Sequence, residues 1–164
     1  MNTVATIDKL QDAWIPAIYR DRVRTQRTRS YEMDIPEREN KADILFTLLG
    51  IDLKVGNRRF ACPDLATARY LQTFARLGCG SVAVPYDITK ISVLADELEV
   101  AWHKMLLQNK QCNADSSPQA LGRARAALIR QVRAEIAELG AGEKMPEFKS
   151  RSTGGVAART RPDK

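Results

Sequence analysis

The segment GIDLKVGNRRFACP, residues 50–63, has the pattern of a β-hairpin and decides the fold prediction. Its first half alternates apolar and charged residues, which is the period of a strand with one buried face. Gly56-Asn57 favours a tight two-residue turn between antiparallel strands, and residues 58–62 then form the returning strand. The segment therefore predicts two paired strands with a defined register.

This register separates an apolar side of the hairpin from a charged side. Leu53 lies opposite Phe60 on the side that we expect to face the core, and Lys54 lies opposite Arg59 on the other side, with Asp52 beside them. A like-charge pair across two strands is unfavourable by itself. The charged side is therefore interpreted either as a solvated face that limits edge-to-edge association or as a surface that contacts phosphate.

The preceding stretch, IPERENKADILFTLLG (residues 35–50), has two interpretations. As a helix over residues 36–49, it has a proline in its first turn, glutamates near its N-terminus and a glycine at its end. As a strand, its apolar run over residues 44–49 would lead into the hairpin. We prefer the helix, because a turn built from Leu48 and Leu49 would expose two leucines. The strand stays open as the alternative.

The residues after the hairpin predict a helix, a strand and two further helices. Residues 63–78 begin with a proline and an acidic residue and end at a glycine, as helices do. SVAVP (residues 81–85) is a short buried strand, so the hairpin, this helix and this strand suggest a parallel βαβ unit. Residues 86–106 and 117–139 predict amphipathic helices. We expect an α/β or α+β fold with a small sheet of three to four strands packed by helices.

We divide the chain into four parts on this basis. The core domain covers residues 32–110, and helical extensions flank it on both sides. The expected parts beside the core are a basic N-terminal helical arm over residues 1–31, a C-terminal amphipathic helix over 117–140, and a basic tail over 141–164. Pro16 should interrupt the helix of the arm. The tail is polar and rich in small residues, so we expect it to be disordered without a partner.

The charge of the chain is concentrated towards its ends. The net charge is +6, with +3 over residues 1–30, −2 over 31–115, +2 over 116–144 and +3 over 145–164. Basic ends beside a nearly neutral centre suggest contact with a polyanion, most often nucleic acid. The alternative is that the charge serves solubility alone.

Basic side chains in three regions are the candidate contacts to nucleic acid. The densest group, RDRVRTQRTR, lies between Tyr19 and Tyr31, and arginines beside aromatic rings suit phosphate contact and base stacking. The other two groups lie on the hairpin and on the last helix. The predicted contacts are Arg20, Arg22, Arg24, Arg27, Arg29, Lys54, Arg58, Arg59, Arg123, Arg130 and Arg133. For the densest group, a solvated helix end is an equally good interpretation.

Several classes of site and location are excluded or disfavoured by the residue inventory. The chain has three cysteines, none in a C-x-x-C pair, and His103 is its one histidine, which argues against a Cys/His zinc site. It has no P-loop or dinucleotide-binding glycine pattern. We expect reduced thiols, a cytoplasmic location and no membrane partner, because secretion signals and long apolar runs are missing.

An Asp-x-Lys motif on the first hairpin strand, within IDLKVG…PDLATARYLQTFARLGCGSVAVP, resembles the core of the PD-(D/E)xK nucleases, the restriction-endonuclease-like family. The likeness covers residues 43–85. It implies that Asp43 and Asp52 hold Mg²⁺ or Mn²⁺ and that Lys54 orients or activates water. The alternative is that Asp52 neutralises Lys54 and Arg59 on a solvated strand face.

Three functions are compatible with these patterns. We prefer a non-catalytic nucleic-acid-binding protein without a cofactor, using its basic ends and the basic hairpin face; whether the partner is DNA or RNA stays open. The first alternative is a metal-dependent nuclease of the PD-(D/E)xK type. The second is a helical scaffold or assembly subunit, in which the amphipathic stripes over residues 91–105 and 121–139 pair with a second copy or another protein.

Overall fold

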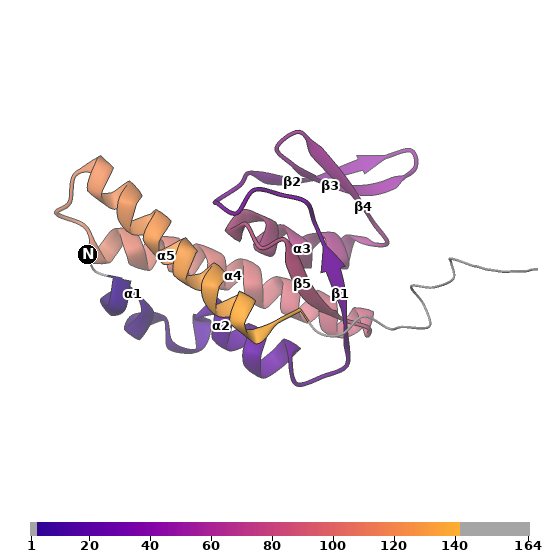
Figure 1. The fold of residues 1–164 in the computed structure, drawn as a ribbon, viewed down its shortest axis with the longest axis horizontal. Helices are drawn as coiled ribbons and strands as arrows, with labels where there is room; N and C mark the ends of the chain where they lie inside the picture. The colour runs from indigo at the N-terminus through magenta and orange to yellow at the C-terminus, as the bar shows by residue number, and fades with distance from the viewer. Residues whose placement is uncertain (1–2, 142–164) are drawn as a thin grey trace, which may run out of the picture.

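The computed structural model describes residues 3–141 and has a mixed α+β fold, as expected. Figure 1 shows a small sheet above α3, the long helices α4 and α5 across the middle, and the N-terminal helices below them. The elements in chain order are α1 (Thr3–Leu10), η1 (Gln11–Ala13), α2 (Ile15–Ile18), η2 (Tyr19–Val23), β1 (Thr28–Glu32), β2 (Ala42–Thr47), β3 (Gly50–Val55), β4 (Arg58–Cys62), α3 (Leu65–Leu77), β5 (Ser81–Pro85), α4 (Ile88–Cys112) and α5 (Pro118–Leu139).

The strands form two separate antiparallel sheets, one of β2, β3 and β4 and one of β1 and β5. The hairpin register is as predicted, with Leu53 opposite Phe60 and Lys54 opposite Arg59. The predicted parallel βαβ unit is wrong, because β5 pairs antiparallel with β1 rather than with the hairpin. A strand pattern indicates burial but does not name the partner strand, and the N-terminal segment supplies that partner here.

The predicted helix over residues 36–49 is also wrong, because residues 42–47 form strand β2 beside β3. Ile44 lies opposite Leu53, so the apolar run extends the buried face of the hairpin. The turn between β2 and β3 does expose Leu48 and Leu49, which are 106% and 101% exposed. The exposure of two leucines, which was the reason to prefer a helix, therefore occurs in the fold.

The helix ends follow the signals in the sequence. The side chain of Asp64 accepts from the backbone N–H of Thr67 at the start of α3, and Ser117 does the same for Ala120 at the start of α5. Gly78 ends α3 in the left-handed conformation, at φ +82°, and a Cβ there would clash with the backbone of Arg38. These caps place the sharp turn that leads from α3 into β5.

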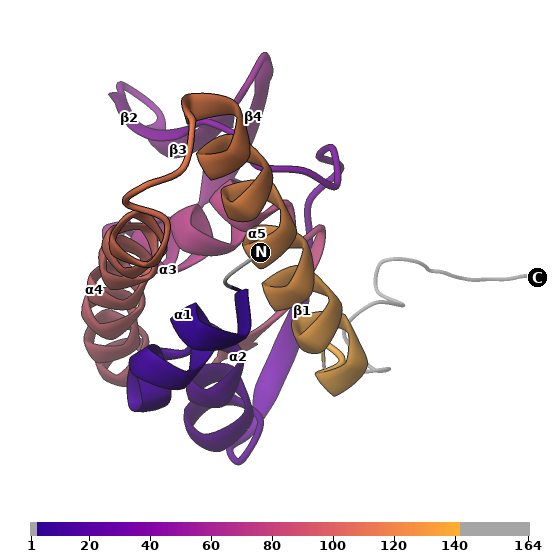
Figure 2. The same cartoon turned by 90° about the vertical axis from the view of Figure 1, so that its left-hand side faces the viewer.

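The N-terminal segment belongs to the core, contrary to the expectation of an arm over residues 1–31. Ile15, Tyr19 and Val23 are fully buried and lie in the same apolar cluster as Leu128 of α5. Figure 2 shows α1 and α2 lying between α4 and α5. The helix does restart at Pro16, which lies in the first turn of α2. Apolar burial rather than charge therefore determines where this segment lies.

The far side of β5 is closed by two tyrosine hydroxyls instead of a third strand. The backbone N–H of Ala83 donates to the Tyr19 hydroxyl at 3.0 Å, and the Tyr70 hydroxyl donates to the Ala83 carbonyl at 2.7 Å. Tyr19 also donates to the carbonyl of Gly140 at 2.5 Å. Burial raises the pKa of both tyrosines, so both hydroxyls keep their protons at neutral pH.

Within residues 3–141, no helix is both long and apolar enough to cross a bilayer. The predicted helix over residues 117–140 is present as α5. The predicted disorder of the basic tail falls, from residue 142 on, outside the residues that the structure describes.

Candidate nucleic-acid interface

The five arginines of the dense basic run do not form one surface. Arg20 pairs with Asp21 at 2.8 Å, and the hydrogen bond lowers the pKa of that carboxyl. Arg22 pairs with Glu97 of α4 at 2.9 Å. Arg24 donates to the carbonyl of Leu139 at the end of α5. These three guanidinium groups are already neutralised or engaged in holding helices together.

Arg27 and Arg29 instead lie over tyrosine rings. The guanidinium of Arg29 lies 5.2 Å from the ring centre of Tyr31 and 5.7 Å from that of Tyr86, and Arg27 lies 5.3 Å from Tyr86. Residues 27, 29 and 31 share one side of the chain because side chains alternate along a strand. We call Arg27, Arg29, Tyr31 and Tyr86 the Arg–Tyr ladder.

The register between β1 and β5 brings Tyr86 to this ladder. Thr28 pairs with Pro85 at the end of the two strands. Arg27 precedes Thr28 and Tyr86 follows Pro85, so these two residues face each other just beyond the last hydrogen-bonded pair of the sheet. Tyr86 is 40% exposed. Nothing in the sequence near Tyr86 indicates this role, because it depends on the pairing of two distant strands. Tyr19, the other ring that flanks the arginine run in the sequence, is buried and unavailable to an outside partner.

The ladder has the electrostatic properties of a phosphate and base contact. The ion pairs among the described residues do not include Arg29, and its Nε is buried without a hydrogen-bond partner. Stacking uses the flat face of a guanidinium and leaves its in-plane N–H groups able to donate. Each contact contributes about 0.5–1 kcal/mol at an exposed site. The rings of Tyr31 and Tyr86 thus orient the Arg29 cation without neutralising it.

The polar face of the hairpin is, in contrast, internally neutralised. Asp43 of β2 lies directly opposite Lys54, which in turn lies opposite Arg59. Arg59 also reaches Asp52, at 3.8 Å. Arg58, at the turn, pairs with Asp34 at 2.5 Å. The repulsion between Lys54 and Arg59 is therefore offset by carboxylates of the protein itself, without phosphate.

The same geometry bears on the metal site that the nuclease resemblance implies. Asp43 and Asp52 do share a face on adjacent strands, but each lies opposite a different residue, Lys54 and Leu45 respectively. Each carboxylate has a cation of the chain beside it. Across residues 3–141, no three His, Cys, Asp or Glu side chains gather closely enough to hold a metal ion. These residues fit charge neutralisation better than Mg²⁺ or Mn²⁺ binding.

The predicted arginines of α5 point in different directions. Arg123 and Arg130 are exposed and lie seven positions apart, on one side of the helix. Arg133 donates to the carbonyl of Leu77 at 2.7 Å and so completes the end of α3. Arg125, which was not predicted, pairs with Glu39. Only Arg123 and Arg130 of the three predicted arginines are oriented for an outside partner.

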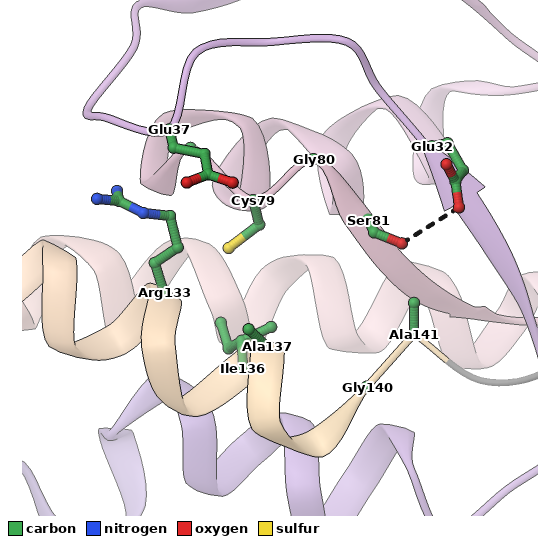
Figure 3. A pocket seen from close by; sticks show the side chains of 11 residues that line it. Glu32, Glu37, Cys79, Gly80, Ser81, Arg133, Ile136, Ala137, Gly140 and Ala141 are labelled. Atoms are coloured by element: carbon green, nitrogen blue, oxygen red, sulfur yellow. Dashed lines mark hydrogen bonds between the residues drawn. The ribbon is translucent and has the colours of Figure 1, made fainter.

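Arg133 also lines a cavity of about 430 Å³ between α5 and the start of β5. Figure 3 shows Glu32, Glu37 and Cys79 around it, with Ser81 bonded to Glu32. Two carboxylates make this cavity unfavourable for phosphate. Burial raises the pKa of Cys79 to about 12, so its thiol is protonated and a poor nucleophile at neutral pH. The cavity therefore offers neither an anion site nor a reactive thiol.

A second, open hollow of about 440 Å³ lies where α4 approaches the start of β2. The guanidinium of Arg76 lies 6.0 Å from a ring of Trp102 here, and His103 is beside it. Glu39 and Asp43 line the same hollow, so its charge is mixed. Arg76 was not among the predicted contacts, and its neighbour Trp102 comes from a different helix, α4.

Of the predicted contacts, the fold brings Arg27 and Arg29 together with aromatic rings, and it separates the others or pairs them with acids. The ladder is thus the strongest candidate site of the described chain. Comparison of this chain with protein-family models, with curated proteins and with solved structures finds no match.

Proposed function

We propose that the protein binds nucleic acid without cleaving it and that single-stranded segments contact the Arg–Tyr ladder. The observation that carries the proposal is the alternation of two cations and two aromatic rings on one surface. Proteins that bind single strands combine basic grooves with aromatic rings, on which successive bases stack. The partly exposed ring of Tyr86 suits stacking, and the guanidinium edges suit phosphate oxygens.

The remaining positive charge supports the proposal as a weaker, diffuse contribution. The chain carries a net charge of +6, and Arg123 and Arg130 are exposed on α5. Such charges raise affinity for any polyanion by releasing counterions, independently of sequence. We therefore expect weak sequence selectivity and a steep loss of affinity with salt.

The test is fluorescence anisotropy with labelled single- and double-stranded DNA and RNA oligonucleotides at several salt concentrations. Replacement of Arg27 and Arg29 by lysine keeps the charge but removes the planar stacking cation. We expect single-strand affinity to fall by about tenfold, in the range of one lost stacking contact. The matched control replaces Arg20 and Arg22 by lysine, since both pair with carboxylates, and should change affinity by less than about twofold.

Two outcomes would contradict the proposal. One is the absence of binding by the wild-type protein at low salt. The other is an equal loss of affinity in the control pair, which would show that the arginines of the ladder contribute no more to binding than arginines outside it. Parallel incubations with Mg²⁺, Mn²⁺ or EDTA, analysed on a gel, test the nuclease alternative, and we expect no metal-dependent cleavage.

A further inference from the structure

The outer edge of β2 combines open backbone groups with exposed apolar side chains. The sheet order is β2, β3, β4, so β2 has a strand on one side only (Figure 1). Phe46 is 72% exposed, and the turn after it exposes Leu48 and Leu49 completely. Figure 2 shows the loops of this sheet standing clear of the helices. The edge is therefore accessible.

The direction of each backbone group along β2 follows from one hydrogen bond. The N–H of Gly56 donates to the carbonyl of Lys41 at 3.3 Å, so the odd-numbered residues of β2 face β3. The even-numbered residues then face outwards. The carbonyl of Ala42 confirms this alternation, because it accepts from the side chain of Gln72 at 2.8 Å. Within residues 3–141, Ile44 and Phe46 have no such partner on the outer side.

β2 also lacks the features that keep edge strands apart. Exposed edges are normally protected by charged side chains, prolines or bulges. The other edge strand of this sheet, β4, begins with Arg58 and Arg59. β2 reads Ala-Asp-Ile-Leu-Phe-Thr, with Asp43 as its one charge. An apolar strand with open hydrogen-bonding groups is a template for pairing with another strand.

We propose that β2 pairs antiparallel with β2 of a second copy of this chain, about a two-fold axis at Leu45. In this register the N–H and C=O groups of Ile44 bond to those of Phe46 of the partner subunit, and the reverse, so both sheets join into one of six strands. A shift towards the N-terminus would place Phe46 against Ala42, whose carbonyl is occupied by Gln72. A shift towards the turn would place Ile44 against Leu48, beyond the strand.

The side chains are self-complementary in the same register. Ile44 lies opposite Phe46 of the partner subunit, so the exposed ring of Phe46 is covered by an apolar side chain. Asp43 lies opposite Thr47, which places no like charges directly across the axis. Leu45 meets its own copy on the outer face. A closed two-fold contact of this kind satisfies the edge without leading to open fibres.

The experiment measures the mass of the full chain in solution by sedimentation over a range of concentrations. The wild type should dimerise. Leu45→Lys and Leu45→Glu each place like charges opposite one another at the axis and should raise the dissociation constant at least tenfold, whereas an equimolar mixture of the two should form a heterodimer.

Phe46→Lys should also dissociate the dimer, and this side chain is exposed enough to be replaced without loss of folding. Leu107→Lys, at a 56% exposed apolar residue of α4, is the matched control and should leave the dimer intact.

Each alternative result overturns the proposal. A wild type that stays monomeric at every concentration excludes the pairing. Dissociation by Leu107→Lys together with dimers in Leu45→Lys and Phe46→Lys would place the contact on the helices. Failure of the charge-swapped mixture to associate, with both variants folded by circular dichroism, would exclude the axis at Leu45.

Discussion

The far side of β5 and the outer side of β2 are both strand edges, but their backbone groups differ in whether they have hydrogen-bond partners. The backbone N–H and C=O of Ala83 in β5 are bonded to buried tyrosine hydroxyls. The corresponding groups of Ile44 and Phe46 in β2 have no partner on the outer side within the described residues. Both edges are apolar, but one lies inside the core and the other at the surface. The difference shows that a strand edge inside the core is paired by the protein's own side chains, whereas an edge at the surface can stay open to water. In the proposed dimer a second chain would take the place of that water.

The first and largest expected effect tests the closed edge. Tyr19→Phe removes the hydroxyl that accepts from Ala83 and donates to Gly140, and it leaves a buried N–H unpaired. We expect a loss of about 1–3 kcal/mol in the free energy of unfolding, measured by urea denaturation. Tyr31→Phe, at a partly exposed ring, is the control and should change it little. Equal losses in both variants would show that the closed edge has no special need of this hydroxyl.

The second prediction concerns the face of the β1–β5 sheet rather than its edge. Tyr86→Ala removes the ring shared by Arg27 and Arg29 and should weaken single-strand binding by about 1–2 kcal/mol, within the range for one stacked base. Double-strand binding, which offers no open bases, should change less. The thermal midpoint should fall by a few degrees at most, because the ring is partly exposed and loses two contacts of about 0.5–1 kcal/mol each. A large fall in the thermal midpoint would show that the ring serves folding instead.

The third prediction examines the one outer group of β2 that does have a partner. Gln72→Leu removes the amide that donates to the carbonyl of Ala42 at 2.8 Å. We expect a loss of about 0.5–1.5 kcal/mol in unfolding free energy, less than for Tyr19→Phe, because one hydrogen bond is lost rather than two. Urea denaturation of the two variants side by side gives the comparison. A greater loss for Gln72→Leu than for Tyr19→Phe would mean that the edge of β2 depends more on a side-chain hydrogen bond than the edge of β5 does.

Local signals predicted part of this architecture, and pairing over long distances supplied the rest. The register of Leu53 with Phe60 follows from the alternation and the Gly56-Asn57 turn, and the start of α5 follows from Ser117. The strand β2 was the alternative to the preferred helix over residues 36–49, because the exposure of two leucines in a turn counted against it. The fold nevertheless leaves both leucines exposed in the turn that joins β2 to β3.

The candidate site was predicted by composition but not by position. The arginine run was recognisable, yet which arginines stay available depends on partners far along the chain, such as Glu97 for Arg22. Tyr86 reaches the ladder only through the pairing of β1 with β5. Asp43 was expected on a helix, and its strand position opposite Lys54 brings a carboxylate to the predicted basic face of the hairpin. Residue type is visible in a sequence, whereas charge pairing across strands is not.

The last and smallest expected effect separates the hairpin face from the ladder. Asp52→Ala frees Arg59 from a contact of 3.8 Å in which the arginine is largely exposed. A weak surface pair of this kind should change the unfolding free energy by less than about 1 kcal/mol. If the ladder carries binding, removal of this carboxylate should raise single-strand affinity by about twofold at most, since salt screens a distant charge. Anisotropy titrations of Asp52→Ala beside Tyr86→Ala measure both effects on the same oligonucleotide. A gain of about tenfold or more in Asp52→Ala would place the nucleic acid on the hairpin, because only a charge in direct contact with phosphate has an effect of that size.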